Sequence, residues 1–171
     1  MATISQAGLE DVSELNRLVN AAYRGESSTA GWTHEADLLE GIRIDEEQLA
    51  SIINRKDTFL LKYTEDKNIA GCVLLEKQGE ELYLGMLTVN PLLQAKGIGK
   101  ALLSSAENKA RETGCKKIKM TVITLRTELI SWYKRHGYSD TGAREPFPVQ
   151  DSKWGTPRLP LQFMVMEKEL R

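Results

Sequence analysis

The chain has 171 residues, with 23 basic and 24 acidic side chains and a formal net charge of −1. A chain of this length buries about 70% of its extended surface, so we expect one domain over residues 1–171. The balanced charge argues against nucleic acid and anionic lipid as partners. The longest apolar run, Ile69–Leu75, is far shorter than a membrane span, and the N-terminus lacks a leader pattern, so we expect a soluble, cytoplasmic protein without membrane contact.

The two cysteines, Cys72 and Cys115, are too few for a disulfide framework in a chain of this size. Their separation matches no metal-ligand spacing. We expect both to be reduced thiols that are buried or half-buried, and we expect no metal site.

The first part of the chain predicts a strand followed by helices. Ala2–Gln6 is expected to form a short strand, and apolar residues recur at helical spacing from Leu9 to Ala22. A turn-rich stretch, residues 23–33, follows. The next helical region is expected to be split into Glu35–Gly41 and Asp45–Asn54.

Three strand-like runs follow, Thr58–Tyr63, Ile69–Gln78 and Glu81–Val89, and they predict an antiparallel meander. A long helix with an unusually small buried face is then expected from Ile98 to about Gly114.

The remaining pattern predicts, in order, strand Lys117–Ile123, helix Glu128–His136, strand Tyr138–Arg144 and a final strand Leu161–Leu170. Because a long helix joins two strands, the sheet must contain at least one parallel pair. The expected fold is mixed α/β (α+β), with a mostly antiparallel central sheet flanked by helices. The final strand is expected to offer an open edge, and a homodimer is one expectation from it.

A glycine-containing turn stands where the third strand of the meander ends and the long helix begins. Gly97 and Gly99 allow backbone N–H groups to approach a bulky ligand, and a helix N-terminus favours phosphate. A Walker A loop is excluded because Gln94 and Ala101 replace its glycine and hydroxyl residues. A dinucleotide fingerprint would need a third glycine where Leu102 stands. The alternative is a glycine cap without a ligand.

The segment 87–100 carries the pattern Gln94-x-x-Gly97-x-Gly99. It resembles the acyl-CoA signature of the GNAT superfamily of N-acetyltransferases. The segment 132–138, Trp-Tyr-Lys-Arg-His-Gly-Tyr, resembles the Tyr-x-x-x-Gly-Phe/Tyr motif of the same family. The order of the expected elements also fits the GNAT fold.

This resemblance implies acetyl-CoA as co-substrate and assigns residues to it. The end of the strand would pair with the pantetheine arm through main-chain groups, as a ligand that adds a strand does. The turn's amides would cradle the pyrophosphate, with two lysines adding charge. The implied residues are Leu87, Thr88, Val89, Gln94, Ala95, Lys96, Gly97, Ile98, Gly99 and Lys100.

The resemblance also implies that Tyr133 is the general acid that protonates the leaving thiolate, for which a phenol of pKa near 10 is suited. A core aromatic beside Trp132 is the alternative. Relatives often carry Asn and Ala where this chain has Arg126 and Leu129. Arg126 is expected to contact the CoA phosphates or the substrate. The alternative is an exposed arginine at the start of the helix. His136 is expected to cap its helix rather than to titrate in catalysis.

The acceptor side has fewer indications. Histone-type relatives place a glutamate on the central strand, but residues 82–89 contain none. Trp32 is expected either to form an aromatic wall against a cationic substrate or to anchor a loop. Glu35 is expected either to contact the substrate or to lie at the start of a solvated helix. The segment Glu145–Pro148 could also reach the acceptor. Weaker candidates are Tyr23, Glu76, Tyr83 and Trp154.

The function implied by the resemblance is transfer of an acetyl group from acetyl-CoA to a primary amine of a small molecule or peptide. The amine attacks directly in a ternary complex, and an amide near Val89 polarises the thioester carbonyl. Two alternatives remain open. One is a catalytically silent acyl-CoA sensor or interaction module, and the other is a protein Nα- or lysine acetyltransferase.

Overall fold

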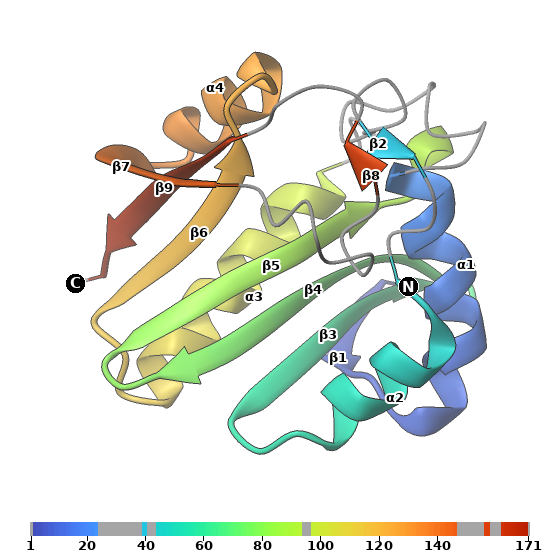
Figure 1. The fold of residues 1–171 in the computed structure, drawn as a ribbon. Helices are drawn as coiled ribbons and strands as arrows, with labels where there is room; N and C mark the ends of the chain where they lie inside the picture. The colour runs from blue at the N-terminus through green and yellow to red at the C-terminus, as the bar shows by residue number, and fades with distance from the viewer. Residues whose placement is uncertain are drawn as a thin grey trace.

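The computed structural model describes residues 2–23, 39–40, 44–93, 97–146, 156–157 and 162–170. Within these segments the chain forms a seven-stranded sheet and a separate two-stranded sheet (Figure 1). In chain order the elements are β1 (Thr3–Gln6), η1 (Leu9–Asp11), α1 (Val12–Tyr23), β2 (Leu39–Glu40), α2 (Glu46–Asn54), β3 (Thr58–Glu65), β4 (Asn68–Gln78), β5 (Glu81–Val89), η3 (Pro91–Leu93), α3 (Ile98–Glu112), β6 (Lys117–Ile123), α4 (Thr127–Arg135), β7 (Ser139–Pro146), β8 (Thr156–Pro157) and β9 (Gln162–Glu169).

The large sheet has the strand order β1-β3-β4-β5-β6-β9-β7. The neighbouring strands are antiparallel except for β5 and β6, which are parallel and are joined through α3. The predicted meander β3-β4-β5 and the predicted parallel pair are therefore both confirmed. A crossover helix is required here because parallel neighbours cannot be joined by a hairpin.

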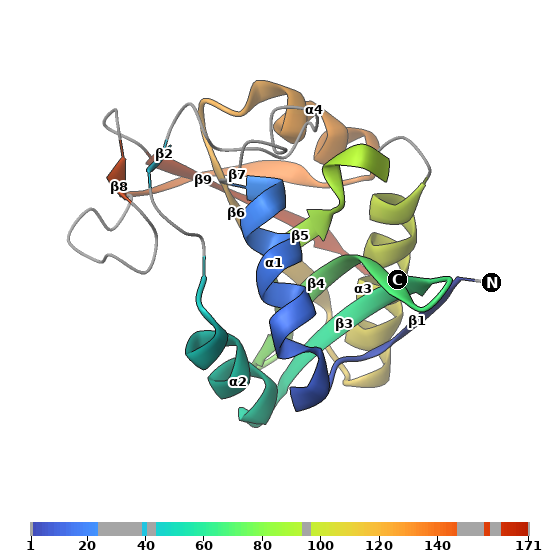
Figure 2. The same ribbon diagram turned by 90° about the vertical axis from the view of Figure 1, so that its right-hand side faces the viewer.

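Helices cover both faces of the sheet, with α1 and α2 on one face and α3 on the other (Figure 2). The buried residues accordingly form two clusters. One includes Leu102 of α3 and Tyr133 of α4, and the other includes Leu15 of α1 and Leu49 of α2. Cys72 and Cys115 are both buried and are not joined in a disulfide, as the sequence predicts.

The buried side of α3 is small, as expected, because Gly99, Ala106 and Ala110 are among its buried residues. This lets the helix approach β4 closely. A Cβ built on Gly71 of β4 would lie 2.8 Å from the Thr88 carbonyl oxygen and 3.0 Å from Cγ2 of Ile98. The position of the helix start relative to the sheet therefore depends on the absence of side chains at this contact.

Two expectations from the sequence are wrong. The final strand is not an edge, because β9 lies between β6 and β7 and pairs antiparallel with both. The edge on this side of the sheet is instead β7, whose residues are all exposed. The argument for a homodimer from an open final strand therefore loses its basis.

The second error concerns the helix expected over Glu35–Gly41. Leu39–Glu40 is extended and pairs with Thr156–Pro157, so a distant partner supplies its backbone hydrogen bonds. Residues 35–38 and 41 of that expected helix lie outside the described residues.

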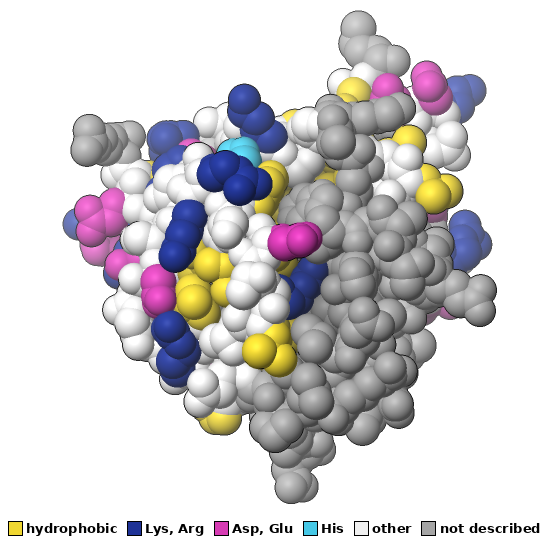
Figure 3. All heavy atoms as spheres, turned by 90° about the horizontal axis from the view of Figure 1, so that it is seen from above, with side chains coloured by type: hydrophobic (Ala, Val, Ile, Leu, Met, Phe, Trp, Pro, Cys, Tyr) yellow, Lys and Arg dark blue, Asp and Glu magenta, His cyan; other side chains and the backbone are white. Residues whose placement is uncertain are grey.

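The end of the molecule that carries α4 shows Lys and Arg side chains interleaved with acidic, apolar and uncharged ones (Figure 3). The described part of this face therefore has no field of a single sign. None of the helices in the described segments has the length and apolar character needed to cross a membrane.

Candidate active site

The site begins with an irregularity in β5. Between the pairs Cys72–Thr88 and Leu74–Gly85, β5 contains one residue more than β4. Met86 takes up this bulge with φ of 50°, a left-handed conformation that is uncommon for a side chain of this kind. A bulge bends its strand and increases its twist, and β5 therefore changes direction here.

The consequence appears on the other side of β5. The parallel pairing with β6 covers only Glu81–Tyr83 against Lys117–Lys119, and beyond Tyr83 the two strands separate. The whole of β6, Lys117–Ile123, pairs with β9, so Met120–Ile123 keeps that partner but is not paired with β5.

A cavity of about 520 Å³ occupies this separation, with walls from α2, β4, β5, β6, α4 and β9. Leu87 and Tyr133 of its lining belong to the core cluster beneath α3, whereas Leu74 and Met86 belong to the cluster beneath α1 and α2. The cavity therefore reaches both faces of the sheet. A Cβ built on Gly85 would meet only the Tyr83 ring, at 3.4 Å, so this part of the wall has open space in front of it.

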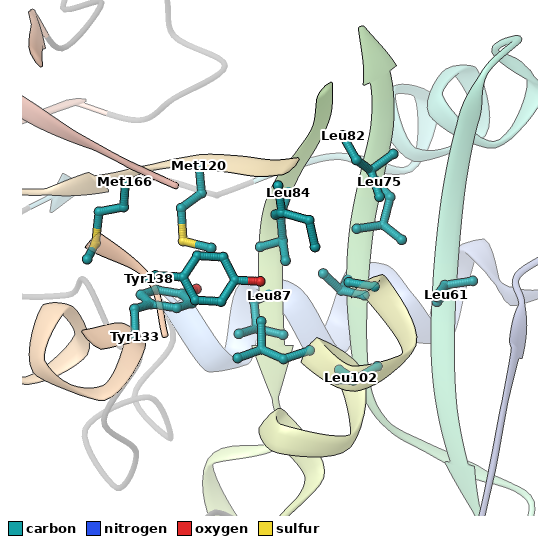
Figure 4. Packing of buried hydrophobic residues seen from close by; sticks show 14 of the residues in the cluster. Leu61, Leu75, Leu82, Leu84, Leu87, Leu102, Met120, Tyr133, Tyr138 and Met166 are labelled. Atoms are coloured by element: carbon teal, nitrogen blue, oxygen red, sulfur yellow. The ribbon is translucent and has the colours of Figure 1, made fainter. Parts of the chain in front are cut away.

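Tyr133 lines the cavity and is 4% exposed. Its ring packs edge-on against Trp132, with centroids 5.2 Å apart, and against Tyr138, at 5.9 Å. Tyr133 and Tyr138 lie side by side near Met120 and Leu87 (Figure 4). Tyr133 is therefore part of the core, which was the alternative expected from the sequence, and it also reaches the cavity.

Tyr138 provides the contrast. It is 2% exposed, does not line the cavity, and its hydroxyl has no hydrogen-bond partner among the described residues. Burial, with a further contribution from Glu107, raises the pKa of its phenol well above the usual range. Of these two neighbouring tyrosines, only Tyr133 lines the cavity.

Arg126 is the N-cap residue of α4, is 9% exposed, and also lines the cavity. The exposed helix start considered for this residue is therefore wrong. The sequence could not show this, because the burial follows from the packing of α4 against the separated strands. His136 contacts the Trp132 carbonyl oxygen through Nδ1 at 2.8 Å, in agreement with the predicted capping role.

The part of the cavity wall near α2 carries polar side chains. Glu76 of β4 forms an ion pair with Arg55, with 3.4 Å between Oε1 and Nη1. The Tyr83 hydroxyl lies 2.8 Å from Oγ1 of Thr121, which joins β5 to β6 just where they begin to separate. Glu76 and Tyr83 were weak candidates in the sequence, and the structure brings both to the cavity.

The glycine turn lies next to the end of β5. Gly97 is the N-cap of α3 with φ of 79°, and a Cβ there would meet nothing within 4 Å. Gly99 is different, because its Cβ would lie 3.2 Å from Cζ2 of Trp132. The absence of a side chain at Gly99 therefore lets α4 pack against the start of α3. Ile98 is buried and Lys100 is exposed in the first turn of the helix.

Among the described residues predicted to bind acetyl-CoA, only Leu87 lines the cavity together with Tyr133. Thr88 and Val89 continue β5 toward the glycine turn. The other predicted residues that the structure describes are Gly97, Ile98, Gly99 and Lys100, at the start of α3.

Several predicted residues lie outside the described part of the chain, namely Gln94, Ala95, Lys96, Trp32, Glu35 and Trp154. The side chain of Tyr23 is not described either, and of the segment 145–148 only Glu145 and Pro146, in β7, are described. Among the described residues, no group of His, Cys, Asp and Glu side chains is suited to hold a metal ion.

Comparison with models of known protein families shows to which family the chain belongs. The model of the acetyltransferase (GNAT) family matches residues 15–138. The chain belongs to the GNAT acetyltransferase family. The match includes both the glycine turn and the Tyr133 segment on which the resemblance in the sequence rests.

The chain is 28% identical over 96 residues to YdhI of Bacillus subtilis, a protein described as uncharacterized, and the match covers 56% of this chain and 58% of YdhI. The chain therefore spans less than two thirds of that relative.

Solved structures share the fold at lower identity. The structure of the PaiA N-acetyltransferase of Thermoplasma acidophilum with coenzyme A is 20% identical, with a TM-score of 0.72 and 99% of each chain covered. The structure of YncA of Salmonella typhimurium, described as a putative acetyltransferase with its cofactor acetyl-CoA, is 18% identical, with a TM-score of 0.75 and coverage of 100% of this chain and 95% of YncA. The E. coli ribosomal-protein-S18-alanine N-acetyltransferase is 17% identical, with a TM-score of 0.71 and coverage of 99% and 94%.

Proposed function

We propose that this GNAT protein transfers an acetyl group from acetyl-CoA to a primary amine of a small molecule or peptide. The cavity between β5 and β6 is the observation that carries the proposal, because it reaches both faces of the sheet. A thioester can then approach from the face of α3 and an amine from the face of α2. The two substrates meet in one ternary complex.

The start of α3 suits the diphosphate of acetyl-CoA. A helix N-terminus presents backbone N–H groups and a partial positive charge, and Gly97 leaves the approach to it open. Lys100 adds a positive charge in the first turn. From there the end of β5, Leu87–Val89, leads into the cavity and would hold the thioester arm along the strand.

Tyr133 is the residue we assign to the chemistry. The nitrogen of the amine forms a bond to the thioester carbonyl carbon, and the C–S bond then breaks. Tyr133 donates its phenolic proton to the departing thiolate, which would otherwise carry a charge in a site largely shielded from water. Its place in the cavity wall supports this role.

The first test is calorimetric titration of the protein with acetyl-CoA, followed on the same sample by a thiol-release assay. The amines are 1,4-diaminobutane, alanine amide, lysine and a peptide with a free N-terminus. Binding with thiol release on one class supports the proposal and identifies the acceptor. Binding without release on any amine would favour an acyl-CoA sensor, and absence of binding would contradict both functions.

A further inference from the structure

Acetyl transfer requires a group that takes a proton from the acceptor. A primary amine is an ammonium ion at neutral pH, and its nitrogen has no lone pair for attack until a proton has left. The central strand β5 carries no acidic residue between Leu82 and Val89. A carboxylate that serves as this base would therefore come from another element.

The register of the sheet brings such an acid to the cavity. Glu76 of β4 pairs directly with Tyr83 of β5. Directly opposed residues of antiparallel strands point to the same face, with Cβ atoms about 5 Å apart. Both side chains line the cavity, at the level where β5 and β6 begin to separate. A carboxylate missing from the central strand is thus supplied by its neighbour.

The surroundings of Glu76 leave it able to bind a cation. Its side chain is 27% exposed, and its one polar contact in the described part of the chain is the single 3.4 Å approach to Arg55. Arg55 is itself 52% exposed, so this ion pair is weak. Most of the hydrogen-bonding capacity of the carboxylate remains for a ligand.

The other acids of the cavity are less suited. Asp45 is exposed and already accepts a hydrogen bond from the Gln48 N–H as the N-cap of α2. Glu47 is exposed in the first turn of the same helix. Within the described part of the chain, the charged and titratable groups that share the cavity with Glu76 are Glu47 on α2, Asp45 and Arg55 at its two ends, Tyr83 on β5, Arg126 at the start of α4 and Tyr133 within it.

We propose that Glu76 binds the ammonium group of the acceptor and takes up the proton that it loses before attack. This inference rests on the proposed acetyl transfer. The nitrogen loses two protons in total. The first passes to Glu76 and then to solvent, and the second replaces the proton that Tyr133 gives to the CoA thiolate. The products are the amide, free CoA and one proton.

The test compares Glu76→Gln with the unaltered protein across pH 6–10, using the amine of the panel with the fastest thiol release. We expect kcat/KM of the variant to fall about 100-fold at pH 7, the scale of general base catalysis. The loss should shrink as pH approaches the pKa of the amine, because free amine then needs no base. Glu76→Asp should recover part of the activity, and acetyl-CoA binding by calorimetry should stay within a factor of three in both variants.

Glu80→Gln is the matched control, because Glu80 lies in the exposed turn after β4 and is 71% exposed. An unchanged pH profile in Glu76→Gln, or a loss of equal size at every pH, would overturn the inference. If the unaltered protein releases no thiol with any amine of the panel, the proposed function fails and the inference fails with it. If the unaltered protein is active and Glu76→Gln matches it, only the inference fails.

Discussion

Tyr133 and Tyr138 show how much depends on the position of a single side chain. Both are buried tyrosines of one motif with touching rings, yet only Tyr133 reaches the cavity. The Tyr138 hydroxyl is buried and has no hydrogen-bond partner among the described residues. Their chemical similarity makes them a matched pair for testing the assigned acid.

For Tyr133→Phe we expect kcat to fall about 100-fold, because the thiolate then leaves without a proton donor. The affinity for acetyl-CoA, measured by calorimetry, should change little because the ring remains. Tyr138→Phe should retain turnover and be at least as stable as the unaltered protein, because it removes an unsatisfied buried hydroxyl. Full turnover by Tyr133→Phe would contradict the assignment.

Asp11 illustrates an electrostatic contact that supports the fold far from the cavity. Its Oδ2 accepts hydrogen bonds from Lys62 Nζ at 2.8 Å and from the Gly8 N–H at 2.9 Å. Burial acts to raise the pKa of this carboxyl, but the hydrogen bonds from Lys62 and Gly8 together lower it overall. The contact ties the start of the first helical segment to β3.

Because the pKa of Asp11 is lower in the folded state, its contribution to stability is present above about pH 4 and is lost as pH falls below that value. We expect Asp11→Asn to lower the unfolding free energy by about 1 kcal/mol at pH 7. Urea denaturation should show this difference shrinking as pH falls below about 4. Asp66→Asn, in an exposed turn, is the matched control for the substitution.

At the scale of elements, the start of α3 and the end of β5 are held together by tight packing. Gly71 permits the approach, since a Cβ there would come within 2.8 Å of the Thr88 carbonyl oxygen. Backbone atoms cannot move aside as the tip of a side chain can. The glycine turn is therefore positioned by β4, a strand that does not take part in the motif.

We expect Gly71→Ala to lower the unfolding free energy by about 1–3 kcal/mol, as overpacking does, and to weaken acetyl-CoA binding. Denaturant unfolding and calorimetric titration measure the two effects. Gly85→Ala is the stability control, because its Cβ would meet only the Tyr83 ring at an ordinary 3.4 Å. Equal stabilities of the two variants would show that the close contact at Gly71 relaxes without cost.

At the scale of the whole molecule, the bulge in β5 and the resulting separation from β6 give the sheet a cavity between two layers of helices. A ligand in this position would contact α2, the sheet and α4 together. Its binding should therefore stabilise the folded chain as a unit.

Saturation with acetyl-CoA at 100 times its Kd should add about 2.7 kcal/mol to the unfolding free energy. For a chain of this size that corresponds to a rise in Tm of about 5–10 °C. Differential scanning calorimetry measures the shift, with acetate in place of acetyl-CoA as the control. An unchanged Tm at saturation would mean that the ligand does not bind the folded state preferentially.

The sequence by itself determined the elements that local pattern controls. The predicted bounds of the strands Glu81–Val89 and Lys117–Ile123 match the structure, because alternation, turns and caps are short-range signals. The glycine turn and the Tyr133 motif were equally local, and they indicated the family.

Only the tertiary structure decided which distant segments meet. It placed β9 between β6 and β7, paired Leu39–Glu40 with Thr156–Pro157, and buried Arg126 in the cavity. It also set Glu76 opposite Tyr83. Strand register and order arise from contacts between residues far apart in the chain, and a pattern along the sequence does not contain those contacts.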